Sequence, residues 1–189
     1  GHIDEITSKE DWKLIQDEGI SVVCITSEIK FCDYLCCIQP EYEVIGRTMA
    51  ELILSRIPEF GSIFLCGGNP KWEAHSAIAR GFKAYLSENS CPNLLYIDHS
   101  WTMDHTNYVN IYNQITRPDV AACCSVYSQG TVMLGEALEE SGRAGRLFAV
   151  GSDLSDMTAD RLRRSVFNNV IQKNPYAQGY IGIRTLTEF

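Results

Sequence analysis

Apolar and polar positions along the chain predict strands and helices in alternation. Short runs that are apolar on both faces predict buried strands at residues 20–25, 34–38, 62–66, 94–97, 120–126, 147–151 and 166–171. Between these runs, apolar residues recur at helical spacing, as in the stripe of Ile45, Met49, Leu52 and Ile53. The helices are expected at about 8–18, 40–57, 73–87, 104–115, 129–141, 155–164 and 175–187. This βαβα order predicts an α/β fold of parallel sheets flanked by helices.

Several helix ends carry local signals. Thr7 and Glu10 have the spacing of a capping box, and Gly19 is placed as the left-handed residue that ends the same helix. Pro40 suits the first turn of the next helix, and Pro58 ends it. These signals place the first two helices independently of the apolar pattern.

The stretch 61–82 is the most informative part of the chain. It predicts a buried strand, a tight turn at Gly67-Gly68 and then a helix. Ligands of parallel α/β sheets bind in the crevice at the carboxyl ends of the strands. Residues 69–75 are therefore expected to lie where a small molecule can bind.

Charge and hydrophobicity limit the kinds of partner that the chain is expected to bind. The net charge of −8 and the isoelectric point of about 5.0 disfavour binding to a phosphate backbone by this chain alone. No apolar run is long enough to span a bilayer, and the first residues do not form a signal peptide, so no membrane partner is expected. The 45% of apolar residues are sufficient to bury a sizeable core.

The eight cysteines are expected to be reduced. Cys24, Cys66 and Cys123 lie in apolar strand runs, where a free cysteine behaves as a small hydrophobic residue. Adjacent pairs such as Cys36-Cys37 point to opposite faces of a strand, which fits neither a disulfide framework nor zinc-ligand spacing. This usage favours packing over metal or redox chemistry, and a reducing compartment such as the cytoplasm.

Motifs for catalysis are weak. The chain has no G-x-G-x-x-G, no phosphate-binding P-loop and no G-x-S-x-G. Asp98-His99 and Asp104-His105 resemble a base with an orienting carboxylate, but no nucleophile is placed beside them by spacing. We therefore expect no enzymatic activity, no cofactor and no metal.

The loops at the expected strand ends instead suit a sugar. They combine aromatic rings, on which a pyranose face stacks, with amide and carboxylate groups that pair with hydroxyls. The side chains in question are Asn69, Trp72, His99, Trp101, Tyr127, Ser128, Gln129 and Asp153. Each tryptophan fits the edge of the core equally well, and Asp153 fits a helix N-cap as well as a ligand contact.

Four segments resemble one known family. They are Gly46-Arg47, the pair FLCGG and RGFKAYL, the tetrapeptide VGSD at 150–153, and VIQKNPYAQGYIGIRTL at 170–186. From about residue 20 onward the chain resembles the ligand-binding part of LacI-type bacterial transcriptional regulators and the related periplasmic sugar-binding proteins. The last segment resembles Q-x-P-x-x-x-G-x-x-A-x-x-x-L and is the most specific match.

The resemblance implies a type I periplasmic-binding-protein-like architecture of two α/β lobes with the ligand between them. On that map, residues 3–58 are a partial N-terminal lobe, 61–168 a nearly complete C-terminal lobe and 172–189 a return to the N-terminal lobe. The family's DNA-binding helix-turn-helix, its hinge helix and its first strands have no counterpart, so the chain is expected to be a fragment.

The resemblance also implies ligand residues. Asp153 matches the family's ligand aspartate, and Gln172 is the nearest residue to the crossover glutamine, although it is one position further from Pro175. Glu41 stands where the family commonly has an aspartate, and Trp101 falls near an aromatic residue that stacks on the sugar.

Two departures from the family indicate altered specificity. Ser128-Gln129 replaces a common Asn-Asp, and Ile78 stands where the family has a sugar-clamping arginine. Ile78, Phe82 and Tyr85 are spaced as the core face of a helix. Recognition is therefore expected to shift to Asn69, Trp72 and Asp153.

Three functions remain open at this point. The main hypothesis is the sugar-effector domain of a LacI-type regulator, dimeric when full length and contacting operator DNA only through another domain. The alternative is a periplasmic sugar-binding protein of an ABC transporter. The third is an α/β enzyme, which the absence of nucleophile and cofactor motifs disfavours.

Overall fold

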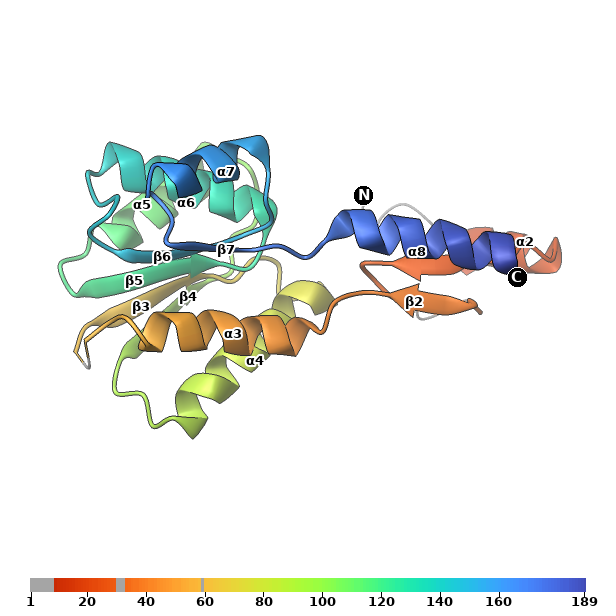
Figure 1. The fold of residues 1–189 in the computed structure, drawn as a ribbon, viewed down its shortest axis with the longest axis horizontal. Helices are drawn as coiled ribbons and strands as arrows, with labels where there is room; N and C mark the ends of the chain where they lie inside the picture. The colour runs from red at the N-terminus through yellow and green to blue at the C-terminus, as the bar shows by residue number, and fades with distance from the viewer. Residues whose placement is uncertain (1–8, 30–32, 59) are drawn as a thin grey trace. The chain divides into compact units, whose positions relative to one another are not determined.

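The computed structural model describes residues 9–29, 33–58 and 60–189. Its contacts divide the chain into two compact units, which are treated separately (Figure 1). The smaller unit comprises residues 1–40 and 174–189, and the larger comprises residues 41–173. The capping box expected at Thr7 lies outside the described residues.

The larger unit is built on a five-stranded parallel sheet. Its strands are β3 (Ser62–Cys66), β4 (Leu94–Asp98), β5 (Val120–Ser125), β6 (Phe148–Ser152) and β7 (Asn169–Ile171). They pair in the order β4-β3-β5-β6-β7, and every pairing is parallel. This arrangement confirms the predicted fold class.

Helices cover both faces of this sheet. On one face lie α3 (Tyr42–Leu54) and α4 (Glu73–Glu88), and on the other lie α5 (His105–Ile115), α6 (Ser128–Glu140) and α7 (Asp156–Arg163) (Figure 1). Every residue of β3 is buried, which explains why its sequence is apolar on both faces. None of the helices in the described part of the chain has the length and apolar character needed to cross a membrane.

Buried cysteines fill the same core. Cys66 is 2% exposed, and Cys123 and Cys124 are fully buried. Cys24 is buried in the smaller unit. The cysteines of the described residues are free thiols, as expected for side chains used in packing.

The helix α3 belongs to the larger unit, which corrects the expected lobe boundary at residue 58. The cause is the close packing of α3 on α4. A Cβ atom on Gly46 would lie 1.9 Å from the Ile78 carbonyl oxygen, and one on Gly81 would lie 2.0 Å from that of Glu43. Only glycine permits this approach of two helix backbones, and the division falls at Pro40 instead.

The start of α3 also differs from the prediction. The helix begins at Tyr42, with Glu41 as the N-cap residue, so Pro40 precedes the helix rather than forming its first turn. Its last residue is Leu54, three residues before the expected end. The other helices and strands agree with the predicted order, with ends that differ by a few residues.

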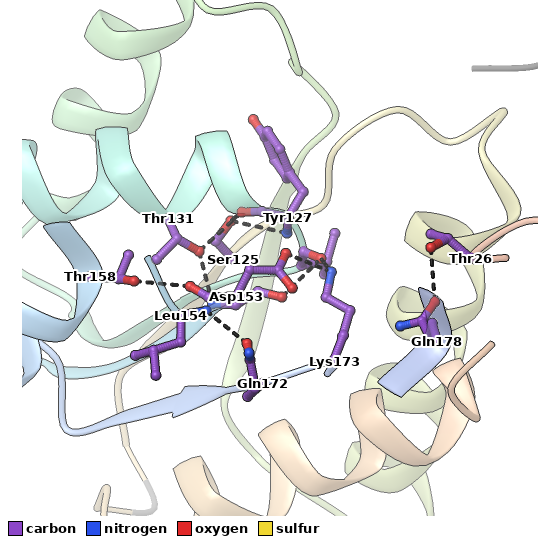
Figure 2. A network of polar contacts seen from close by, with 12 residues as sticks. Thr26, Ser125, Tyr127, Thr131, Asp153, Leu154, Thr158, Gln172, Lys173 and Gln178 are labelled. Carbon is purple, nitrogen blue, oxygen red and sulfur yellow. Dashed lines mark hydrogen bonds and ion pairs between the residues drawn. The ribbon is translucent and has the colours of Figure 1, made fainter. Parts of the chain in front are cut away.

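The smaller unit contains α2 (Lys9–Asp17), β1 (Val23–Ile25), β2 (Cys36–Ile38) and α8 (Pro175–Glu188). The strands β1 and β2 pair in parallel, and α8 packs against them at Gly182, whose Cβ position is 3.2 Å from Ile25. Gly19 has φ +68°, which confirms its predicted role after α2. The Thr26 hydroxyl at the end of β1 donates to Gln178 Oε1 of α8 at 2.9 Å (Figure 2).

Candidate functional site: an aromatic pocket at the strand ends

A pocket lies at the carboxyl ends of β3, β4 and β5 in the larger unit. Its volume is about 260 Å³, near the lower end of the range for small-molecule sites. We call it the aromatic pocket, and it is lined by Trp72, Trp101, Thr102, Met103, Tyr127 and Gln129. Each of these residues follows a strand of the parallel sheet, where this fold class places its ligands.

The turn after β3 sets the position of Trp72. Gly68 has φ +62°, and a Cβ atom there would lie 2.4 Å from His75 Nδ1, so glycine is required. The Asn69 backbone N–H donates to that Nδ1 at 3.0 Å. Asn69 Oδ1 accepts from the Lys71 N–H at 3.0 Å, which closes an Asx turn. The buried Asn69 therefore shapes the turn, and it is absent from the pocket lining.

Four aromatic rings form a continuous chain beside the pocket. The Trp72 ring centroid lies 4.9 Å from that of Trp101 and 5.0 Å from that of His75. The His75 ring in turn lies 5.2 Å from Tyr127. These separations are typical of favourable tilted aromatic pairs. The rings of Trp72 and Trp101 therefore pack against each other on one side of the pocket.

Tyr127 is the buried end of this chain. Its hydroxyl donates to the Ser100 carbonyl oxygen at 3.1 Å, and Asn107 Nδ2 lies 3.4 Å away. Burial raises the pKa of Tyr127, so the phenol stays neutral over the physiological range. The ring is held by this bond and presents an uncharged surface to the pocket.

The predicted site residues Ser128 and Gln129 are the first two residues of α6, and they differ in whether they line the pocket. Gln129 is exposed and lines the pocket, where its amide can donate to and accept from a hydroxyl. Ser128 begins α6 but is not part of the lining.

Asp153 and Gln172 lie in a second polar group of the larger unit, at the ends of β6 and β7 (Figure 2). Asp153 Oδ2 forms an ion pair with Lys173 Nζ at 3.0 Å, and the same ammonium donates to the Val126 carbonyl oxygen at 3.1 Å. Gln172 Oε1 accepts from the Leu154 N–H at 3.0 Å. Both predicted residues thus have partners within the protein.

Asp153 does not cap a helix, which corrects one of the two roles considered for it. The N-cap of α7 is Ser155, which forms a capping box with Thr158. Asp153 has φ +68°, a left-handed conformation that aspartate tolerates better than most residues. Its backbone is held by bonds to Ile171 and Thr158.

Hydrogen bonds beside this group tie the end of β5 to the end of β6 (Figure 2). Thr131 Oγ1 donates to the Tyr127 carbonyl oxygen at 3.0 Å and accepts from the Ser152 N–H at 2.8 Å. Ser125 Oγ donates to the same Tyr127 carbonyl oxygen at 3.0 Å. The strand ends that carry Tyr127 and Asp153 are therefore fixed to each other.

Two predicted positions lie away from the aromatic pocket. Glu41 is exposed and precedes α3, and it is not part of the lining. Ile78 is fully buried together with Phe82, as the helical stripe predicts. Position 78 of α4 therefore contributes an apolar side chain to the core.

Lys173 was not predicted as a site residue, and His75 was included only as the last residue of the stretch 69–75, without a role of its own. The sequence did contain an indication for Lys173. In the resembled pattern a glutamine stands two residues before the proline, and in this chain Lys173 occupies that position before Pro175. For His75 the signal was weak, since its role depends on the turn at Gly68. In residues 9–29, 33–58 and 60–189, no group of three histidine, cysteine or acidic side chains is arranged to hold a metal ion.

A parallel α/β unit with an aromatic pocket at its strand ends defines a small-molecule-binding class of domain. Residues 13–189 match the family model described as a periplasmic binding protein domain. The chain belongs to this family. No curated protein sequence matches the chain.

Solved structures with the same fold include three sugar-related binding proteins. A sugar-binding protein of a sugar ABC transporter from Bacillus halodurans has 16% identity and a TM-score of 0.85, covering 96% of this chain and 63% of that chain. An ABC transporter solute binding protein from Agrobacterium vitis with bound D-fucose has 18% identity and a TM-score of 0.82, covering 95% and 63%. GanP, a glucose-galactose binding protein from Geobacillus stearothermophilus, has 16% identity and a TM-score of 0.78, covering 95% and 65%. The chain spans 63–65% of the length of these proteins.

Proposed function

We propose that the chain is the ligand-binding part of a sugar-binding protein, of the kind that serves an ABC transporter. The observation that carries this proposal is the aromatic pocket, in which Trp72, Trp101 and Tyr127 stand at the strand ends beside Gln129. Indole and phenol rings cover the apolar face of a pyranose, and an amide pairs with its hydroxyls. Membership of the periplasmic binding protein family supports a binding role rather than catalysis.

The comparisons favour the transporter protein over the regulator of the main sequence hypothesis. The similar structures are of sugar-binding and solute-binding proteins, two of which serve ABC transporters. A LacI-type regulator shares the ligand chemistry, and its operator DNA, dimer and cytoplasmic location stay predictions. The free cysteines are the feature that still favours that second candidate.

A thermal-shift panel of pentoses and hexoses tests the proposal. A sugar that binds the native state raises the apparent melting temperature, by a linkage that depends on its concentration and affinity. Trp72→Ala and Trp101→Ala should each weaken the binding about 5-fold to 150-fold, because one lost aromatic platform costs about 1–3 kcal/mol by analogy with base stacking.

Trp12→Phe is the matched control, because Trp12 lies in α2 of the smaller unit. It should leave the affinity unchanged. A panel in which no sugar stabilises the protein, or in which the pocket variants bind as well as the control, contradicts the proposal.

A further inference from the structure

A second pocket lies at the opposite, amino-terminal ends of the strands in the larger unit. Its volume is about 480 Å³. The lining includes Val120 and Phe148 at the starts of β5 and β6, together with Arg56, Arg143, Arg146 and Asn168. We call it the arginine pocket. Among the residues that the structure describes, no acidic side chain occurs in this lining.

These arginines differ from the others in the chain. Arg47, Arg80, Arg117, Arg161, Arg164 and Arg184 each form an ion pair with a carboxylate. Among the described residues, Arg56, Arg143, Arg146 and Arg163 have no such partner, and all of these but Arg163 line the pocket. In a protein with net charge −8, three uncompensated positive charges are thus gathered at one place.

Arg143 is the partly buried arginine of this pocket. One of its terminal nitrogens donates to the Val120 carbonyl oxygen at 2.9 Å, which fixes the guanidinium. Its Nε is buried and has no hydrogen-bond partner in the described part of the chain. A buried charged donor without an acceptor is destabilising.

Helix ends account for only part of the positive charge. The helices α3 and α6 end at Leu54 and Glu140, shortly before Arg56 and Arg143 in the sequence. Each helix C-terminus carries about half a negative charge, so two of them offset about one of the three positive charges. The nearby acid Asp119 is already engaged, since its carboxylate accepts from Ser62 Oγ at 2.8 Å and from Arg117 Nε at 3.2 Å.

We propose that the arginine pocket binds a small phosphorylated molecule through Arg56, Arg143 and Arg146. Guanidinium groups match the oxygens of a phosphate with paired hydrogen bonds. The side-chain nitrogen of Asn168, whose Oδ1 accepts from the Ala149 N–H, is a further donor in the lining. The volume exceeds the need of a phosphate group alone, so an organic part of the ligand fits as well. This site is independent of the aromatic pocket, which lies at the other ends of the strands.

Isothermal titration with inorganic phosphate and with ribose 5-phosphate tests the proposal, each against sodium chloride of equal ionic strength. Saturable binding is expected for both, tighter for the organic phosphate. Arg146→Ala should weaken it at least tenfold, because a charge-assisted hydrogen bond contributes about 1.5–3 kcal/mol and each 1.4 kcal/mol is a factor of about ten. Arg163→Ala removes the same charge from an exposed arginine outside the pocket and should leave the affinity within twofold.

The nitrogen–hydrogen resonance of Arg143 Nε gives a second readout that needs no variant. It should shift during the phosphate titration and not during the chloride titration. The proposal is overturned if binding is not saturable, if chloride produces the same response, or if Arg146→Ala behaves like Arg163→Ala. Binding of inorganic phosphate alone, with no gain from the ribose, overturns the organic part of the ligand.

Discussion

Replacing Lys173 by methionine removes the ammonium group that joins the ends of β5, β6 and β7. Its Nζ lies 3.0 Å from Asp153 Oδ2 and 3.1 Å from the Val126 carbonyl oxygen. The side chains of Lys173 and Asp153 are 14% and 28% exposed. At 3.0 Å and an effective dielectric constant of about 20, the gross attraction is about 5 kcal/mol, most of which desolvation offsets. The net loss of unfolding free energy should be about 2 kcal/mol, the size of a charged hydrogen bond.

A double-mutant cycle separates the ion pair from other effects of the substitution. Asp153→Asn is the suitable partner, because asparagine tolerates the φ of +68° whereas alanine would add about 1 kcal/mol of backbone strain. Each single variant leaves one partner of the pair behind, so the double variant should cost less than the sum of the two. We expect a coupling energy of about 1–2 kcal/mol.

The assay is urea unfolding of the Trp12→Phe protein, in which the fluorescence comes from Trp72 and Trp101 of the larger unit. A coupling energy below about 0.5 kcal/mol would refute the reasoning, since that is the level of additivity between independent sites.

Three further predictions concern packing, pH and thiol reactivity. Gly81→Ala should lower the unfolding free energy by about 3 kcal/mol, because its Cβ would lie 2.0 Å from the Glu43 carbonyl oxygen. Gly179→Ala is the control and should cost nothing, because the space around Gly179 is open. Urea unfolding compares the two variants. Burial raises the pKa of Glu139, but hydrogen bonds from two arginines outweigh burial, so the net effect of folding is to lower this pKa. The stability that Glu139 contributes is therefore present above about pH 4.3 and is lost as the pH falls further. Glu139→Gln should abolish that loss in acid-unfolding curves. Burial raises the pKa of Cys123 to about 12, so iodoacetamide at pH 8 should label this thiol only after unfolding. Peptide mass spectrometry separates it from the less buried Cys36, Cys37 and Cys91, and labelling of Cys123 in the folded protein would contradict its burial.

The order of helices and strands could be predicted because burial leaves a direct trace in the sequence. Every residue of β3 is buried, and all of them after Ser62 are apolar, as expected for a strand covered on both faces. Glycine and proline marked ends such as Gly19 and Pro175. The unit to which α3 belongs could not be predicted from its own apolar stripe. It depends on the contact of Gly46 with the backbone of α4, and a glycine in the sequence does not indicate which helix it contacts.

The candidate site was predictable in kind but less so in detail. Residues that follow the strands were expected to meet, and Trp72, Trp101 and Gln129 do line one pocket. The partners of Asp153 and Gln172 were not foreseeable, because a hydrogen bond of a lysine or an amide depends on angles that residue spacing does not contain. Their role toward a ligand stays a prediction.

The proposed function requires a sugar to bind against Trp72 and Trp101 in the aromatic pocket. A fluorescence titration of the Trp12→Phe protein, with the sugar that gives the largest thermal shift, tests it most directly. Stacking of the sugar on Trp72 and Trp101 should change the emission in a saturable way, with the same dissociation constant as calorimetry. A sugar that binds by calorimetry but leaves this emission unchanged binds elsewhere and would contradict the account.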